Sequence, residues 1–255
     1  MAHVVVLGAG TGGMPAAYEL RDALGNEHEI TVINERDYFH FVPSNPWVAV
    51  GWRNRADITF DIAPYLERKN IKFIAGRCEK IDPTANQLEL AGGQTVKYDY
   101  LMITTGPKLF FEEVPGAGPP TGNTHSVCTV DHAEALWQDY QKLLQKGSGH
   151  IVIGAMPFAS CFGPAYEFAF IVDCDLRKRK IRHKFKMTYV SSEPYIGHLG
   201  LGGVGDSKGM LEHELRNHHI DWIVNAKTVN VEAGKLHIEE YGEDKALKKT
   251  HEIAF

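Results

Sequence analysis

The 255-residue chain has few cysteines, no long apolar run and no surplus of positive charge. No apolar run approaches the roughly 20 residues that cross a bilayer as a helix. The net charge of −5 argues against a general attraction to nucleic acid, so no nucleic-acid partner is expected. No C-x-x-C pair occurs among the four cysteines, which are Cys78, Cys128, Cys161 and Cys174.

The N-terminus also lacks the marks of an export signal, because neither a basic segment nor an apolar segment follows Met1. We therefore expect no signal peptide, and cysteines that are catalytic, metal-binding or inert rather than paired. A zinc motif is incomplete as well. After His213-Glu214 the next histidines come five and six residues on, whereas one helix face needs a spacing of four. No metal is expected.

Glycine, in contrast, is concentrated near the start of the chain. Residues 4–7 form an unbroken apolar run, typical of a strand buried on both faces. Gly8, Gly10 and Gly13 follow it with the spacing G-x-G-x-x-G, which suits a tight turn, a close approach to a pyrophosphate and helix–strand contact. A helix expected over residues 12–24 would point its amino end at the phosphates.

A second expected strand, residues 29–33, ends at Asn34 and Glu35. Glu35 lies 22 residues after Gly13, close to the spacing of the acid that binds a ribose hydroxyl. Strand, turn, helix and acid together predict a dinucleotide site. These residues alone do not distinguish FAD from NAD.

The rest of the first half predicts one doubly wound domain with a β-meander. Residues 37–47 contain two prolines among several aromatics and are expected to form a loop. Residues 57–70 carry apolar positions at helical spacing, which predicts a helix. The expected strands are residues 71–75, a hairpin of 87–90 and 95–98, and a buried strand over 101–106.

Four prolines and several glycines between residues 107 and 124 mark a boundary, and we place the domains at 1–115 and 116–255. A helix over 131–146 follows, for which Asp131 is the expected N-cap and Glu134 completes a capping box.

The chain then repeats itself. Residues 150–155 match residues 3–9, and residues 164–168 match residues 16–20. A helix over 164–179, a strand over 186–190, a helix ending at 217 and further strands complete the repeat. The sequence therefore predicts an α/β protein of two tandem Rossmann-like domains with meander insertions, the second incomplete at its C-terminal end.

The second turn has lost its glycines, since Met156 stands for Gly10 and Cys161 for Gly13. This bulk lies where a pyrophosphate needs bare backbone, so we expect no ordinary NAD(P) binding there. Glu193, after the second strand of the repeat, stays a candidate ribose acid.

The cysteine of that turn is a candidate nucleophile. Ser160 is the expected cap of the next helix and Pro164 suits its first turn. Cys161 would then lie at a helix N-terminus, where the dipole favours the thiolate. The alternative is a small residue that only fills space.

Further candidates are Cys128 and His132, four residues apart, and His198 in a glycine-rich loop after a strand. The Cys128 pattern is equally consistent with an inert thiol. Cys78 and Cys174 are expected to be packing thiols, and the basic run 177–186 a solvated surface.

Together these motifs resemble the flavoproteins with two dinucleotide-binding domains, the FAD-dependent pyridine nucleotide-disulfide oxidoreductase superfamily. Within this group the chain looks like the bacterial sulfide:quinone oxidoreductases. The segments that carry the resemblance span nearly the whole chain: 8–13, 41–47, 105–108, 128–132, 153–155, 160–167 and 193–198.

The resemblance implies FAD as cofactor and oxidation of sulfide to polysulfide sulfur, with electrons passed to a membrane quinone. Cys161 would be one of two cysteines that carry the sulfur chain, Cys128 an auxiliary cysteine, and His132 and His198 the acid–base histidines. The residues implied to hold the adenosine half of FAD are Gly8, Ala9, Gly10, Thr11, Gly12, Gly13, Asn34, Glu35, Arg77, Cys78 and Gly106.

Members of that family continue beyond this length with a third redox cysteine, a quinone pocket and amphipathic helices. We therefore expect a fragment, soluble and inactive alone, of a peripheral membrane protein that could form homo-oligomers. The alternatives are a type II NADH dehydrogenase, the flavin subunit of flavocytochrome c sulfide dehydrogenase, or a non-catalytic flavin- or nucleotide-binding module.

Overall fold

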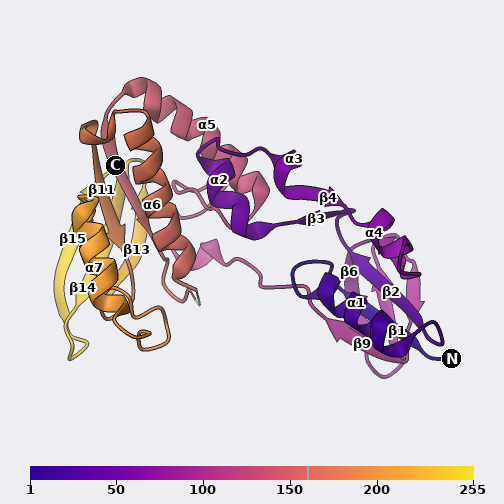
Figure 1. Cartoon of the computed structure of the whole chain (residues 1–255). Helices are drawn as coiled ribbons and strands as arrows, with labels where there is room; N and C mark the ends of the chain where they lie inside the picture. The colour runs from indigo at the N-terminus through magenta and orange to yellow at the C-terminus, as the bar shows by residue number, and fades with distance from the viewer. Residues whose placement is uncertain (160) are drawn as a thin grey trace. The chain divides into compact units, whose positions relative to one another are not determined.

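The computed structural model describes residues 1–159 and 161–255, which form two compact units. Unit 1 comprises Met1–Phe41 and Arg55–Leu109, and unit 2 comprises Val42–Asn54 and Phe110–Phe255. Each unit contains its own parallel sheet and its own antiparallel meander (Figure 1). The expected α/β architecture of two Rossmann-like folds is confirmed. The expected domain limits, 1–115 and 116–255, stay a prediction, and they differ from these units at residues 42–54 and 110–115.

The sheet of unit 1 has the order β5-β2-β1-β9, and all its neighbours are parallel. Its strands are β1 (His3–Leu7), β2 (Glu29–Asn34), β5 (Lys72–Ala75) and β9 (Tyr100–Ile103). As expected from its apolar run, β1 is buried on both faces. Val4 and Val6 pack in the cluster that includes helix α1 (Gly13–Leu24), and Val5 and Leu7 pack in the cluster under the meander.

That meander consists of β6 (Cys78–Asp82), β7 (Gln87–Leu90) and β8 (Thr95–Lys97), paired antiparallel. Leu88, Leu90 and Val96 cover one face of the parallel sheet. The expected hairpin is confirmed, and a third strand precedes it.

Two expectations for unit 1 and its neighbourhood were wrong. Residues 57–70 are not one helix but α3 (Arg55–Ile58), β4 (Thr59–Asp61) and α4 (Ala63–Glu67). Ile58, Ile62 and Leu66 are all buried, and their spacing of four suits this strand-and-turn arrangement as well as a helix. Residues 37–47 are not a plain loop, because β3 (Tyr38–His40) pairs with β4 and Phe39 stacks on Phe60 at 4.8 Å.

The end of that segment belongs to unit 2. A 3-10 turn (Val42–Ser44) leads into α2 (Asn45–Ala49). Val50 is fully buried in the main core of unit 2, against which Trp47 and Trp52 also pack. Apolar burial therefore assigns this short segment to the second unit.

Unit 2 repeats the plan of unit 1 with the parallel sheet β10-β11-β12. Its strands are β10 (Gly149–Gly154), β11 (Phe185–Val190) and β12 (Asp221–Ile223). Its long helices are α5 (Val130–Lys146), α6 (Gly163–Lys178) and α7 (Ser207–Asn217), and short 3-10 turns occupy Phe111–Glu113 and Arg182–Lys184. The meander is β13 (Ala226–Glu232), β14 (Lys235–Tyr241) and β15 (Leu247–Ala254).

The start of α5 differs from the expected capping box. Thr129, not Asp131, is the N-cap: its backbone is extended and its side chain accepts a hydrogen bond from the amide of His132 at 3.2 Å. Threonine is a favoured cap because its hydroxyl satisfies an amide that the helix leaves unpaired. The helix therefore begins one residue earlier than expected.

The C-terminal end of α6 is held by two buried carboxylates. Asp173 accepts from Arg177, Arg182 and His218, and Asp175 accepts from Arg179, Trp52 and Tyr140. The first part of the basic run is thus paired within the unit rather than uniformly solvated. Within the described part of the chain, no helix is both long and apolar enough to cross a membrane.

Candidate functional site

The carboxyl edge of the first sheet collects the residues implied to bind the cofactor. Because β1, β2, β5 and β9 are parallel, their carboxyl ends meet at one edge. The segments that leave this edge are residues 8–13, 34–35, 76–78 and 104–106. Four stretches far apart in sequence therefore surround one place in unit 1.

The first turn is shaped by contacts that exclude side chains. Gly8 has φ +109°, and a Cβ there would lie 2.5 Å from the carbonyl oxygen of Thr104. A Cβ at Gly13 would lie 1.9 Å from the carbonyl oxygen of Gly8. Thr104, which the sequence analysis did not single out, places its hydroxyl 3.0 Å from the carbonyl oxygens of both Leu7 and Gly8. The only sequence feature that could have pointed to Thr104 is the group of small residues after a buried strand.

Gly10 is different, because it faces open space. A Cβ at Gly10 would meet no heavy atom of the described residues within 4 Å, apart from those of its chain neighbours. Gly10, Thr11 and Gly12 are exposed, and α1 begins at Gly13 with no side-chain cap. Bare backbone at an uncapped helix start is the cradle that a pyrophosphate requires. These residues fit a dinucleotide.

The acid and amide at the end of β2 have separate roles. Asn34 accepts from the amide of Ala9 at 3.0 Å and donates to the carbonyl of Arg36 at 2.8 Å, so its side chain stabilises the turn. Glu35, the next residue, is exposed at the same edge. Glu35 is thus available to a ribose hydroxyl.

The other two segments implied to bind the cofactor, residues 77–78 and Gly106, follow β5 and β9 at the same edge of the sheet. The carbonyl of Arg77 accepts from Ala91, and Cys78 begins β6 with its Sγ 3.5 Å from the carbonyl of Lys80. Burial raises the pKa of the Cys78 thiol, which agrees with a packing role for that side chain. Gly106 is exposed, and a Cβ there would meet no described heavy atom within 4 Å beyond its neighbours.

The second turn, after β10, is closed where the first is open. A Cβ at Gly154 would lie 1.9 Å from the carbonyl oxygen of Val190, a close approach like that of Gly13. Met156 packs against the cluster of Val190, Ala226 and Val231. Phe158 is 86% exposed at φ +65°. This turn therefore presents side chains where a pyrophosphate would need bare backbone.

Cys161 is exposed and lies two residues before α6, whose N-cap is Phe162 with no side-chain cap. Pro164 is in the first turn, as expected. Ser160, the expected cap, lies outside the described residues. An exposed thiol next to an uncapped helix start suits a nucleophile.

Glu193 is not a ribose acid, and that expectation was wrong. It is 1% exposed, and both of its carboxylate oxygens accept hydrogen bonds from within unit 2: Tyr166, Ser191 and the amide of Leu199. The carboxylate points inward because these donors surround it.

The remaining candidates also lie in unit 2. His198 is half-buried in the loop after β11, with its ring edge-on to Tyr195 at 5.2 Å. Since β10 and β11 are parallel, the loops with Cys161 and His198 leave the same edge of the sheet. Cys128 is exposed just before α5, and His132 lies in the first turn of α5, edge-on to Phe111 at 5.8 Å. The carbonyl of Val127 accepts from Asn45, which ties this segment to α2.

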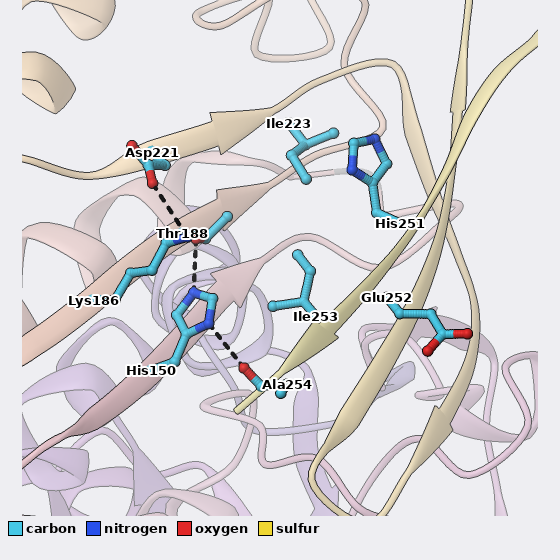
Figure 2. Close-up of a pocket in the computed structure, with 9 residues that line it drawn as sticks. All are labelled: His150, Lys186, Thr188, Asp221, Ile223, His251, Glu252, Ile253 and Ala254. Carbon is cyan, nitrogen blue, oxygen red and sulfur yellow. Dashed lines mark hydrogen bonds and ion pairs between the residues drawn. The ribbon is translucent and has the colours of Figure 1, made fainter.

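The opposite, amino edge of that sheet holds a cavity of about 430 Å³. His150 lies in it between Thr188 and Ala254, 2.8 Å from an oxygen of each (Figure 2). Lys186 and Asp221 line it from the starts of the neighbouring strands. Among the residues that the structure describes, no group of three or more His, Cys, Asp or Glu side chains could hold a metal ion.

Comparison with known proteins agrees with this geometry. The model of the pyridine nucleotide-disulphide oxidoreductase family matches residues 2–250. The chain is 44% identical over 251 residues to the sulfide-quinone reductase of Aquifex aeolicus, an alignment that covers 98% of the chain and 56% of that relative. The chain therefore spans little more than half the length of this curated relative.

Two solved structures extend the comparison. The X-ray structure of the Aquifex aeolicus sulfide:quinone oxidoreductase matches with a TM-score of 0.92 and 43% identity, and covers all of this chain and 57% of that one. The NDH2 of Plasmodium falciparum in complex with NADH matches with a TM-score of 0.77 and 17% identity, over 99% of this chain and 53% of that one. At that identity the second match shows the fold alone.

Proposed function

The chain belongs to the pyridine nucleotide-disulphide oxidoreductase family, and on this premise we propose that it carries the nucleotide-binding turn and a sulfur-handling cysteine of a sulfide:quinone oxidoreductase. The observation that carries the proposal is the 44% identity to a sulfide-quinone reductase over 98% of the chain. The contrast between an open first turn and a closed second turn supports one dinucleotide site rather than two.

FAD is the cofactor of this family, and when bound it accepts the two electrons that leave the sulfur. The backbone of residues 8–13 would hold the pyrophosphate at the uncapped start of α1, with Glu35 at the ribose. Gly106, which is exposed and has open space around it, would lie against the same half of the cofactor.

The sulfur chemistry is assigned to unit 2. Sulfide loses two electrons and a proton, the quinone takes up two electrons and two protons, and the balance is HS⁻ + H⁺ + quinone giving sulfur and quinol. Cys161 would hold the growing sulfur chain on its exposed sulfur, and Cys128 would assist in sulfur handling. His132 and His198 would accept and return the protons.

Because quinones dissolve in the bilayer, the proposal includes a membrane surface as the place of the second half-reaction. The relative's printed name gives sulfide and quinone as its reactants, and these are the substrates that we propose for the protein that contains this chain. We propose that the protein that contains this chain attaches peripherally to that membrane surface.

The test is anaerobic reduction of the flavin in the native, full-length protein. We expect sulfide to bleach the flavin absorbance and NADH to leave it unchanged, because the second turn offers no bare backbone to a nicotinamide nucleotide. Bleaching by NADH but not by sulfide would replace the proposal with an NADH:quinone oxidoreductase. No bleaching by either reductant would favour a binding module without redox function.

A further inference from the structure

Two buried side chains of unit 2, Glu193 and Tyr166, lie beneath the loop that carries His198. Glu193 is 1% exposed and follows β11, while Tyr166 is 4% exposed and is the fourth residue of α6. The same helix begins just after Cys161. These two side chains therefore connect the segment of the candidate nucleophile to the segment of a candidate acid–base histidine.

The connection is made through the backbone on both sides of His198. The amide of Gly197 donates to the hydroxyl of Tyr166 at 3.0 Å, and this hydroxyl donates to Oε2 of Glu193 at 2.8 Å. The amide of Leu199 donates to Oε1 of Glu193 at 2.6 Å. Both amides that flank His198 thus end on one tyrosine–carboxylate pair, which we call the Glu193–Tyr166 clamp.

Several features make the clamp rigid. Ser191 donates to Oε2 of Glu193 at 2.7 Å, so both carboxylate oxygens are engaged inside the unit. Tyr166 stacks on Tyr189 with ring centroids 4.4 Å apart. Burial raises the pKa of the Tyr166 hydroxyl, which therefore remains protonated and continues to donate. Replacing this acceptor leaves buried donors poorly paired, which costs free energy.

The backbone at His198 needs this support. Gly197 has φ +83°, and Leu199, which is not a glycine, has φ +55°. Residues with side chains rarely adopt such a conformation unless their surroundings enforce it, and strained residues of this kind concentrate at functional sites. The hydrogen bond from the amide of Leu199 to Glu193 is one of the contacts that hold this conformation.

We propose that Glu193 and Tyr166 are positioning residues that hold His198 in place relative to the helix that follows Cys161. This inference rests on the proposed function, in which His198 moves a proton during sulfide oxidation. It also explains the acid at position 193: the residue that would bind a ribose in a nucleotide-binding turn instead fastens the chain's own loop.

The test compares Tyr166→Phe and Glu193→Gln with Tyr140→Phe in the native, full-length protein. Tyr140, in α5, is the matched control, because its hydroxyl also donates to a buried carboxylate, Asp175, at 2.9 Å in the same core. Asp175 lies near the C-terminal end of α6, whereas Tyr166 lies in its first turn. We expect kcat for sulfide-dependent quinone reduction to fall about 10-fold or more in both clamp variants, with KM for sulfide within about twofold. The control should keep kcat within about twofold.

A second readout does not depend on turnover. In ¹⁵N-labelled protein, the amide proton of Leu199 should resonate far downfield because of its short bond to a carboxylate. Both clamp variants should move the amide signals of Gly197 and Leu199, and Tyr140→Phe should leave them in place.

The two readouts separate the two claims. Equal losses of kcat in clamp variants and control, or unchanged kcat in the clamp variants, would overturn the positioning role. Unchanged amide signals in Glu193→Gln would reject the clamp itself. If the unsubstituted full-length protein shows the downfield Leu199 signal but does not oxidise sulfide, the proposed function is rejected and the clamp is only structural.

Discussion

The turn after β1 and the turn after β10 occupy equivalent places in their sheets, and part of their framework is the same. In both units a histidine near the start of the first strand lies 2.8 Å from a threonine hydroxyl on the neighbouring strand: His3 with Thr31, and His150 with Thr188. In both turns the glycine that follows or ends the first strand also lies close to a carbonyl oxygen: a Cβ would be 2.5 Å from that of Thr104 at Gly8 and 1.9 Å from that of Val190 at Gly154.

The contents of the two turns differ. In unit 1 the backbone around Gly10 is bare, and Glu35 after the second strand is exposed. In unit 2 Met156 packs into an apolar cluster, and Glu193 is buried under the chain's own loop. The two units therefore share the contacts that shape their sheets, but only unit 1 has open space for a ligand at its turn.

The largest effect that would test this comparison comes from the cysteine in the second turn. Cys161→Ser should lower the rate of sulfide-dependent flavin reduction in the full-length protein by roughly 10²-fold or more, because a hydroxyl is a poor nucleophile at neutral pH. The thermal midpoint should stay unchanged, since Cys161 is exposed. Cys174→Ser, in α6, is the control. A nearly normal rate in Cys161→Ser would mean that this cysteine only fills space.

The next effect separates packing from ligand binding. Gly13→Ala and Gly154→Ala each place a methyl group 1.9 Å from a carbonyl oxygen, and each should cost about 1–3 kcal/mol in the free energy of unfolding measured with urea. Only Gly13→Ala should reduce the flavin that stays bound through gel filtration, because its turn is the proposed cofactor site. Equal flavin loss in both variants would contradict the difference between the turns.

Gly10→Ala provides the control for that experiment. Among the residues that the structure describes, only the chain neighbours of Gly10 have heavy atoms within 4 Å of this methyl group. The free energy of unfolding should therefore change by no more than about 0.5 kcal/mol. The methyl would nevertheless enter the space assigned to the pyrophosphate. We expect weaker flavin retention with unchanged stability, and full retention would mean that the cofactor does not approach Gly10.

The smallest expected effect concerns the amino edge of the second sheet. Burial lowers the pKa of His150 below its usual value near 6.5, so the unfolded chain binds the proton more readily than the folded protein. Stability from this group is therefore present above pH 6.5 and is lost as the pH falls through the lower, folded pKa. In urea unfolding, His150→Gln should flatten the loss of stability with falling pH in that window. An unchanged slope would show that His150 does not contribute.

Much of the framework could be predicted from local patterns. The apolar run before Gly8, the glycine spacing and the helix after it predicted β1, the turn and α1, because each reports a local requirement of the backbone. The repeat of these residues near position 150 predicted the second parallel sheet, since equivalent short segments fold alike. The glycine spacing and Glu35 indicated a nucleotide site directly, whereas Arg77, Cys78 and Gly106 were implied only by the family resemblance.

Other features depended on partners distant in sequence. The spacing of Ile58, Ile62 and Leu66 suits a helix, yet the pairing of β3 with β4 makes residues 59–61 a strand. Residues 42–54 belong to unit 2 because Val50 finds its apolar contacts there.

The sequence by itself determined the α/β class, the duplication and the one turn with bare backbone, because glycine spacing and strand periodicity act over a few residues. Only the tertiary structure decided that Glu193 faces inward. The direction of a carboxylate is set by the donors that it meets, and Tyr166, Ser191 and Leu199 are brought to it from a helix, a strand end and a loop.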